Sequence, residues 1–420
     1  ARAVAIHAGQ QNFAGAEFGD ALRPLDRVEI DALASAMGVD IPMSRSLGAR
    51  LGVDCRDDAL RAEARRRFGK KPGIVDPGGI DADLVRAGVE QAAHVIDAAH
   101  PTADGQRNED LRGDVLSWSD AETKGADLTI YHYALPSPLT APFARLSKGR
   151  VLVYHNITPA HFFAPFDAGV FQLARAGRAE LATLAGVPDL ALGVSEFNRR
   201  ELEAMGFSPT GVLPLAVDLE RLTHAPDRPA IRRMLTDDWA NILFVGRIVP
   251  NKKIEDHILL AEHYKRYVDA RYRFIFVGRH DLMPRYYAMI RGLIDRFQML
   301  PERFVFTGPL PDEELAAVYR SSHAYVSLSE HEGFCAPLVE AMAMDVPIVA
   351  YAAGAVPETL GGAGLMFSPK AFEPAAELLG QVIYDETLRA RVIEGQRARA
   401  AHFAPARVDG DLRALVSRFS

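Results

Sequence analysis

The chain has 420 residues, a formal net charge of −7 and a charged fraction of 25%. A single ordinary core rarely holds so many residues, so two domains are expected. The apolar fraction of 48% is typical of a globular protein, and the negative net charge does not favour nucleic-acid binding. No apolar run reaches the length of a membrane-spanning helix, and no signal peptide is recognisable.

The first 125 residues carry fewer strand signals than the rest of the chain. A buried strand is predicted over residues 2–8, and the glycine turn and helix that follow it are the usual start of a doubly wound unit. The glycines of this turn do not follow the G-x-G-x-x-G spacing of dinucleotide-binding proteins. Further helices are predicted over residues 31–37, 57–68 and 83–99, and a polar loop over residues 105–113.

A basic cluster at residues 65–71 has two interpretations. It is either a solvated helix end or a contact for an anionic acceptor or a membrane surface. The two cysteines, Cys55 and Cys335, lie far apart and lack the spacing of metal ligands. The sequence therefore predicts a reducing cytoplasm, and Cys335 is expected to be a small buried thiol.

From residue 127 onward, strands alternate with helices, which predicts parallel sheets with helices on both faces. Ser195 is expected to cap a helix, and residues 218–238, with two prolines, are expected to connect two domains. Strands are predicted over residues 128–133, 151–154, 190–194, 211–215, 241–245, 272–277, 304–307, 324–328, 346–351 and 365–367. Helices are predicted over residues 179–185, 198–205, 254–267, 286–297, 313–321, 374–383, 387–402 and 405–419.

The stretch from Ser329 to Glu340 lies between a predicted strand and a helix that begins near Pro337. Free backbone N–H groups and the positive end of the helix dipole make such a turn suitable for an anion. The carboxylates of Glu332 and Glu340 are either the acid and base of a glycosidase or ionised acceptors for sugar hydroxyls. Glu330 is expected to be an exposed surface charge.

Other candidate residues also follow predicted strands, and ligands of parallel α/β sheets bind at that edge. Gly246, Arg247 and Lys252 follow the strand over residues 241–245, and the two cations suit a diphosphate. His155 follows the strand over residues 151–154, and His132 at another strand end is a second candidate. The turn at residues 353–355 either approaches the same ligand or is only a turn.

These segments together resemble one known family. E-H-E-G-F-C-A-P-L-V-E-A-M resembles the E-x(7)-E signature of the retaining GT-B glycosyltransferases of family 4. Four further segments resemble the family's motifs in the expected order, and the resemblance covers about residues 126–418. They are V-Y-H-N-I-T-P, F-V-G-R-I-V-P-N-K, F-V-F-T-G-P-L-P-D-E-E-L and V-P-I-V-A-Y-A-A-G-A-V-P-E.

The resemblance implies an α/β GT-B fold, in which two Rossmann-like doubly wound domains face a cleft. Residues 1–218 would form an acceptor-binding domain with a helical insertion within residues 27–125. Residues 219–402 would bind the nucleotide sugar, and residues 403–420 would form a helix that crosses back to the first domain. P-L-A-V-D and V-G-R-H-D replace the family's commoner P-N-G-V-D and V-G-x-G-P.

The resemblance also implies site roles. Arg247 and Lys252 would hold the diphosphate, Glu332 the donor sugar and Glu340 the ribose, while His155 would reach the sugar from the other domain. His155, Glu332, Arg247 and Lys252 are therefore the expected catalytic residues. Gly15 would lie in a glycine turn under the phosphates, where F-A-G-A-E partly matches the family's G-G-x-E. The remaining expected donor contacts are Gly246, Thr307, Gly308, Pro309, Gly333, Phe334, Cys335 and Leu338.

The implied reaction is transfer of a hexosyl unit, with retention, from a UDP- or GDP-linked sugar to a saccharide or lipid-linked saccharide. The donor phosphate would act as the base, without a protein nucleophile, metal or cofactor. The protein would work in the cytoplasm, with a peripheral contact at the inner face of the membrane left open. A nucleotide-sugar epimerase or hydrolase and a non-catalytic nucleotide-sugar binder are the alternatives.

Overall fold

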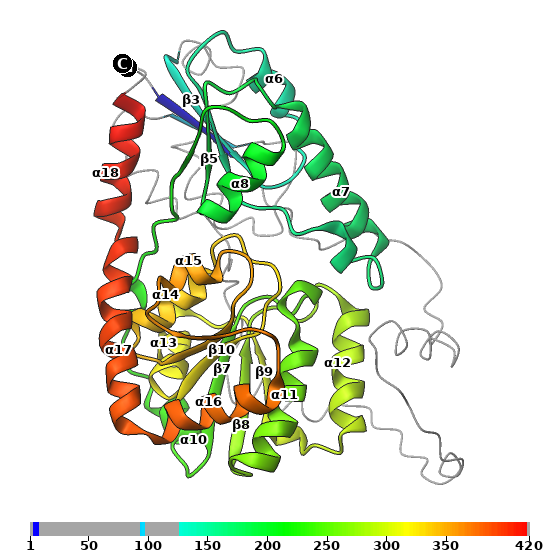
Figure 1. Ribbon diagram of the computed structural model, residues 1–420, viewed down its shortest axis with the longest axis vertical. Coiled ribbons are helices and arrows are strands. Elements are labelled where there is room, and N and C mark those ends of the chain that lie inside the picture. Colours follow the sequence, from blue (N-terminus) through cyan, green and yellow to red (C-terminus); the bar gives the residue numbers. More distant parts are fainter. Residues whose placement is uncertain (1–2, 8–92, 97–125, 418–420) are drawn as a thin grey trace. The chain divides into compact units, whose positions relative to one another are not determined.

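The computed structural model describes residues 3–7, 93–96 and 126–417, which form two parallel sheets with helices packed on them (Figure 1). Several predictions fall outside these residues. They concern Gly15, Cys55, the basic cluster at residues 65–71, the predicted helices over residues 31–37 and 57–68, and the loop over residues 105–113.

The first sheet has the strand order β2-β1-β3-β4-β5-β6 among the described residues, and every neighbouring pair is parallel. The order begins as in flavodoxin-like sheets, where the chain reverses direction across the sheet between the first and third strands. The strands are β1 (Ala3–His7), β2 (Ala93–Ile96), β3 (Leu128–Tyr133), β4 (Arg150–Tyr154), β5 (Leu190–Gly193) and β6 (Thr210–Val212).

The prediction of a helix over residues 83–99 is wrong at β2. Ala93–Ile96 is a strand that pairs with β1 in parallel register, with Val4 opposite Ala93. A short apolar run such as A-H-V-I fits a helix or a strand by periodicity alone. Backbone pairing with β1 decides the outcome, and this pairing is a long-range contact that local sequence does not encode.

Side chains alternate between the two faces of the first sheet, as the strand period of two requires. Tyr131 and Leu152 belong to an apolar cluster that includes residues of α7 and α8, whereas Leu128 and Val151 share a cluster with Val408 of α18. Both faces therefore carry helices. The helical segments on this part of the chain are α6 (Thr140–Ala144), η1 (Ala160–Phe162), α7 (Ala168–Thr183), α8 (Glu196–Ala204) and α18 (Pro405–Val416).

The second sheet has the order β12-β11-β10-β7-β8-β9 and is also parallel throughout. Read from β7, this is the strand order of dinucleotide-binding sheets, and the order reverses where β7 and β10 lie side by side. The strands are β7 (Ala240–Val245), β8 (Tyr272–Val277), β9 (Phe304–Gly308), β10 (Ala324–Ser327), β11 (Ile348–Tyr351) and β12 (Leu365–Phe367).

Helices also cover both faces of the second sheet. Ile242 and Phe244 share one apolar cluster with residues of α11, α12 and α16, and Leu243 and Val245 share another with residues of α13 and α14. The helical segments that follow these strands are η2 (Pro250–Lys252), α11 (Ile254–Tyr267), α12 (Pro284–Arg296), η3 (Pro301–Arg303), α13 (Asp312–Arg320), α14 (Ala336–Ala343), α15 (Val356–Leu360), α16 (Phe372–Tyr384) and α17 (Glu386–Ala400).

Two chain segments connect the sheets. The predicted connection at residues 218–238 contains two short helices, α9 (Glu220–Thr223) and α10 (Pro229–Leu235). The return connection is η4 (Ala401–Phe403), whose Phe403 carbonyl accepts a hydrogen bond of 3.2 Å from the Val217 N–H. The last helix therefore returns to the first sheet, as predicted, while the exact domain boundaries stay predictions.

The two parallel sheets confirm the predicted fold class, and most predicted elements match within a few residues. The largest difference in a helix is α7, which begins at Ala168 rather than at residue 179 because the Asp167 side chain accepts a hydrogen bond from the Val170 N–H. The Ser195 side chain caps α8 through the Asn198 N–H, as predicted. None of the helices in residues 126–417 is long and apolar enough to cross a lipid bilayer.

The ends of β7 and β8 come together at two glycines. Gly278 has a φ of +137°, and a Cβ at this position would lie 2.2 Å from the Gly246 carbonyl oxygen. No side chain fits in that space without moving the backbone of Gly246, the residue before Arg247. Gly278, the glycine of the segment V-G-R-H-D, is therefore required at this position for space.

We expect Gly278→Ala to lower the free energy of unfolding by about 2 kcal/mol or more, because the new methyl group meets backbone atoms in a left-handed conformation. Thermal unfolding followed by circular dichroism measures the change. Gly292→Ala is the matched control, because a Cβ on this residue of α12 meets no atom within 4 Å and should be neutral or stabilising. Equal melting temperatures for Gly278→Ala and wild type would contradict the steric argument.

Candidate functional site

Lys252 and Glu332 form an ion pair at the point where the strand order of the second sheet reverses. The Lys252 Nζ lies 2.6 Å from Oε1 and 2.8 Å from Oε2 of Glu332. Lys252 ends the 3-10 turn after β7, and Glu332 lies in the turn after β10, so the adjacency of these strands brings the two side chains together. Glu332 is 6% exposed, so its charge is nearly removed from water.

The turn after β10 has an unusual backbone at its junction with α14. Cys335 precedes the helix in a left-handed conformation with a φ of +70°, and Pro337 lies in the first turn of the helix, as predicted. The thiol of Cys335 is buried, and burial raises its pKa. A non-glycine residue in this conformation costs about 1 kcal/mol or more, which neighbouring contacts must offset.

One such contact joins the turn to the loop after β4. The side chain of Asn156 lies against Gly333, where an added Cβ would come within 2.4 Å of the Asn156 Cβ. The His331 Nε2 is 3.0 Å from the Asn156 Oδ1 and donates to it when this nitrogen carries the proton. Gly333 is therefore required at this position for space.

His331 is buried, with an exposed fraction of 6%, and burial lowers its pKa to about 4. Its ring centroid lies 5.4 Å from that of Phe197 in an edge-on arrangement. The Asn251 Nδ2 donates a hydrogen bond of 3.0 Å to the His331 carbonyl, so the backbone of the turn is fixed beside Lys252 as well. A neutral imidazole in this place keeps a hydrogen-bond donor without adding a buried charge.

His155 lies at the end of β4, beside a second histidine at the end of β3. The His132 Nδ1 is 2.7 Å from the His155 Nε2, so one of these two nitrogens donates a hydrogen bond to the other. Both histidines were candidates in the sequence, and the parallel pairing of β3 with β4 explains why they meet. The residue after His155 is Asn156, so the segment that carries His155 contacts the turn that carries Glu332.

Glu340 lies one turn into α14, with both carboxylate oxygens engaged by protein groups. The Arg221 Nη2 contacts Oε1, and the Tyr319 hydroxyl donates a hydrogen bond of 2.9 Å to Oε2. Burial raises the pKa of Glu340, whereas the Arg221 guanidinium opposes this rise. The expectation of an ionised carboxylate thus depends on Arg221, a residue that the sequence pattern did not indicate.

The remaining expected donor contacts lie along the carboxyl ends of the strands. Arg247 is exposed after β7, and the Gly278 N–H donates a hydrogen bond of 3.0 Å to the Gly308 carbonyl, which joins the ends of β8 and β9. The Thr307 hydroxyl donates to the same carbonyl at 2.7 Å. Thr307, Gly308 and Pro309 are therefore at the predicted carboxyl edge of the sheet, at the end of β9, which lies two strands from β7.

Phe334 and Leu338, two of the residues expected near the donor sugar, have side chains that pack inside the protein. Phe334 packs edge-on against Phe403 with ring centroids 5.2 Å apart, and its carbonyl accepts a hydrogen bond of 2.6 Å from the Thr359 hydroxyl. Leu338 is fully buried in the apolar cluster of α13 and α14. The side chains of Phe334 and Leu338 thus support the turn, and any donor contact there falls to the backbone.

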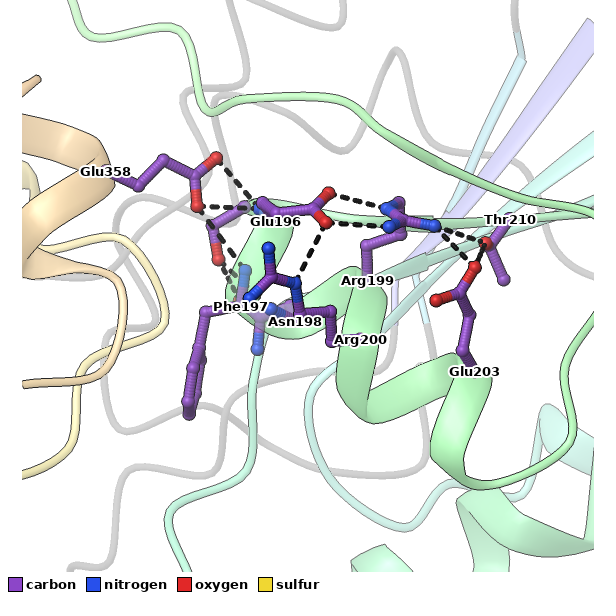
Figure 2. A network of polar contacts seen from close by, with 9 residues as sticks. Glu196, Phe197, Asn198, Arg199, Arg200, Glu203, Thr210 and Glu358 are labelled. Atoms are coloured by element: carbon purple, nitrogen blue, oxygen red, sulfur yellow. Dashed lines mark hydrogen bonds and ion pairs between the residues drawn. The ribbon is translucent and has the colours of Figure 1, made fainter.

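The turn at residues 353–355 contacts the candidate site through its backbone. The Ala355 N–H donates a hydrogen bond of 3.0 Å to the Glu332 carbonyl. The α15 helix follows this turn, and its Glu358 carboxylate accepts hydrogen bonds of 2.8 and 2.7 Å from the Glu196 N–H at the start of α8 (Figure 2). A carboxylate suits this position because helix N-termini carry free N–H groups and partial positive charge.

Glu330 is exposed, as predicted, but it is also paired. The Lys370 Nζ lies 3.0 Å from the Glu330 Oε1 and 2.6 Å from the Asp256 Oδ2. The same ammonium donates to the Leu328 carbonyl at 3.0 Å, so Lys370 fixes the start of the turn. Neither Lys370 nor Arg221 belongs to a motif, and only the packing of distant segments reveals them.

The comparisons with known proteins agree with this geometry. Residues 233–399 match the family described as Glycosyl transferases group 1. A GDP-mannose-dependent alpha-mannosyltransferase of Mycobacterium tuberculosis is 30% identical over 236 residues, which are 55% of this chain and 57% of that protein. The O-antigen chain mannosyltransferase B of Escherichia coli is 26% identical over 221 residues, which are 51% of this chain and 57% of that protein.

The fold is similar to that of a solved structure, Anabaena HepE in complex with UDP and glucose. This likeness has a TM-score of 0.63 at 18% identity and covers 83% of this chain and 98% of that one. The predicted GT-B fold is thereby confirmed. The resemblance seen in the motifs agrees with the family match over residues 233–399. This chain spans little more than half the length of the two curated relatives, 57% of each.

The buried His331 should make stability depend on pH. Its pKa is about 4 in the folded chain and about 6.5 when solvated, so between these values only the unfolded chain takes up the proton. Stability therefore falls as the pH decreases from about 6.5, by about 2 kcal/mol at pH 5, or about 4–8 °C in Tm. His331→Gln should remove this part of the loss.

Melting temperatures at pH 7.5 and pH 5 measure the effect. The variant keeps His257, another buried histidine with a pKa of about 4, so its pH dependence should be reduced rather than abolished. His161→Gln, at an exposed position, is the control and should lose as much Tm as the wild type. An equal loss in His331→Gln and wild type would contradict the assignment.

Proposed function

We propose that the protein is a retaining glycosyltransferase, because residues 233–399 match the family described as Glycosyl transferases group 1. It moves a hexosyl unit from a nucleotide-diphosphate sugar to a hydroxyl group of a saccharide or lipid-linked saccharide. The observation that carries the proposal is the ion pair of Lys252 with the buried Glu332 where the strand order reverses. This is the position at which doubly wound sheets bind their ligands.

The two charges of this pair suit the two halves of a sugar diphosphate. Lys252, with Arg247 exposed at the same edge, supplies positive charge for the diphosphate. Glu332 accepts hydrogen bonds from the hydroxyl groups of the donor sugar. Before the donor binds, each charge is the counterion of the other, so neither is left unpaired in a buried position.

In the proposed reaction, the bond between the anomeric carbon and the diphosphate oxygen breaks, and the leaving oxygen gains negative charge. Lys252, Arg247 and the N-terminus of α14 stabilise that charge. The leaving phosphate takes the proton of the acceptor hydroxyl, whose oxygen then bonds to the same face of the anomeric carbon. His155 orients the sugar from the end of β4, next to the Asn156 contact with the turn.

Two finer features of the donor and acceptor belong to the proposal. The two relatives described above are named as mannosyltransferases, one of them for GDP-mannose, while HepE was solved with UDP and glucose. A guanosine or uridine diphosphate sugar is therefore the proposed donor. We propose that the protein binds its acceptor in the cytoplasm. A lipid-linked acceptor would be bound at the inner face of the membrane.

A thermal-shift screen with UDP, GDP and ADP sugars identifies the donor, because a ligand that binds only the folded chain raises its Tm. We expect a rise of about 2 °C or more with a GDP- or UDP-sugar at concentrations well above its Kd, and none with free hexose. A chain that no nucleotide sugar stabilises would contradict the proposal.

Turnover then separates the proposal from its alternatives. We expect transfer to depend on an acceptor, and proton NMR of the product should show the anomeric configuration of the donor. Release of free or isomerised sugar without acceptor would favour a hydrolase or epimerase, and binding without turnover on a broad acceptor panel would favour a nucleotide-sugar sensor.

Replacing the proposed charged groups should abolish transfer. Glu332→Gln, Lys252→Ala and Arg247→Ala are each expected to lower kcat by about 100-fold or more, because each removes charge or hydrogen bonding at the reacting groups. Initial rates at saturating donor measure this. Arg266→Ala, which removes an exposed cation of α11, is the matched control and should leave kcat unchanged.

Folding must be checked because Lys252→Ala leaves the Glu332 carboxylate buried without its partner, which is costly. The double variant Lys252→Met with Glu332→Gln removes both charges and should recover much of the lost Tm without recovering activity. Full activity in all three single variants would rule the proposed site out.

A further inference from the structure

Glu340 is the second glutamate of the E-x(7)-E segment, and its carboxylate is held from two sides. The Arg221 guanidinium of α9 contacts one oxygen, and the Tyr319 hydroxyl of α13 donates a hydrogen bond of 2.9 Å to the other. The Glu340 side chain is 8% exposed. Its orientation is therefore set by two neighbours rather than by solvent.

These two contacts leave acceptor capacity for a ligand. An ionised carboxylate has about four lone-pair directions, and the two protein donors occupy one on each oxygen. The remaining directions can accept from neighbouring hydroxyl groups such as those of a ribose. A protonated carboxyl would instead present a donor on one oxygen and lose part of this capacity.

Arg221 is the cation that faces this buried carboxylate and opposes the effect of burial on it. Burial raises the pKa of Glu340, Arg221 and the Tyr319 hydrogen bond lower it, and the nearby Asp312 raises it again. Arg221 also contacts Asp312 itself, whose Oδ1 lies 2.6 Å from the Arg221 Nη1. The guanidinium thus bridges two carboxylates, of which only Glu340 is nearly inaccessible to water.

The position of Arg221 does not depend on Glu340 alone. The α9 helix is tied to α13 by Arg320, whose Nη2 donates to the carbonyls of Leu222, Thr223 and Ala225 at 3.1, 3.1 and 3.0 Å. Leu222 is fully buried. The chain therefore offers two arginines that tie α9 to α13, and only one of them reaches Glu340.

We propose that Arg221 is a positioning residue that orients the Glu340 carboxylate to accept hydrogen bonds from the ribose hydroxyls of the donor nucleotide. This inference rests on the proposed function, because it requires that a nucleotide binds at the carboxyl ends of the second sheet. Arg221 acts through Glu340 and does not itself touch the ribose. Tyr319 assists by holding the other oxygen.

The test compares two nucleotides on the same protein. Calorimetric titration gives the Kd of GDP and of 2′-deoxy-GDP, or of UDP and 2′-deoxy-UDP where the uridine sugar gave the larger thermal shift. The wild type is expected to prefer the ribonucleotide by roughly 10-fold or more, because the lost hydroxyl donates to a charged acceptor. A partly unfolded variant weakens both ligands equally, so the ratio of the two Kd values is insensitive to stability.

Arg221→Gln is expected to reduce the ratio to roughly 1–3, as is Glu340→Gln, while Arg320→Gln should keep the wild-type ratio. Arg221→Lys should restore part of the preference for the ribonucleotide. Lysine keeps the positive charge beside Glu340 but lacks the planar guanidinium that fixes the orientation of the carboxylate. The kcat of Arg221→Gln at saturating donor should fall much less than that of Glu332→Gln.

Each other outcome overturns a defined statement. A wild-type ratio in Arg221→Gln, alongside a collapsed ratio in Glu340→Gln, overturns the inference and leaves the proposed function standing. A wild-type ratio in both variants shows that Glu340 does not read the ribose, which also overturns it. A wild-type chain that binds neither nucleotide overturns the proposed function, and the inference with it.

Discussion

The bidentate contact between Lys252 and Glu332 is the interaction on which the rest of the candidate site depends. Removing two opposite charges from water is costly, and the cost is met only when the pair is close and its surroundings supply further hydrogen bonds. The pair is close, because the Lys252 Nζ lies 2.6 and 2.8 Å from the two carboxylate oxygens. The Ala355 N–H and the Asn251 amide donate to the carbonyls of Glu332 and His331 and thereby hold the backbone of the turn in place. The neighbouring strand ends of β7 and β10 bring the partners within reach, so the topology of the sheet creates the pair.

The three carboxylates of the turn and its helix each have their own cation. Lys370 contacts Glu330, Lys252 contacts Glu332 and Arg221 contacts Glu340, and the three cations come from segments before and after the turn in sequence. Anions crowded into one short segment would repel one another without these partners. The arrangement explains how a region with three acidic side chains can also offer positive charge to a diphosphate.

The sequence predicted much of this fold because its second half obeys simple rules. Apolar runs and glycines marked the strand ends, and parallel topology then placed Lys252 near Glu332. What it missed depends on contacts between distant segments: the pairing of Ala93–Ile96 with β1, the salt bridge of Arg221, and the fit of Asn156 against Gly333. The burial of Glu340 was missed for the same reason, since local sequence does not show which side chains surround a carboxylate.

The return of α18 to the first sheet has a consequence for the order of synthesis. Leu128, Val151 and Leu190 pack in one cluster with Val408, although more than 200 residues separate the last of these strands from the helix. Ribosomes make the amino-terminal strands first, and domains usually fold as soon as they emerge. Here the face that α18 packs against lacks this helix until residues 405–416 have been made. The first sheet is thus begun early in synthesis, but the helix that covers part of its apolar face is made more than 200 residues later.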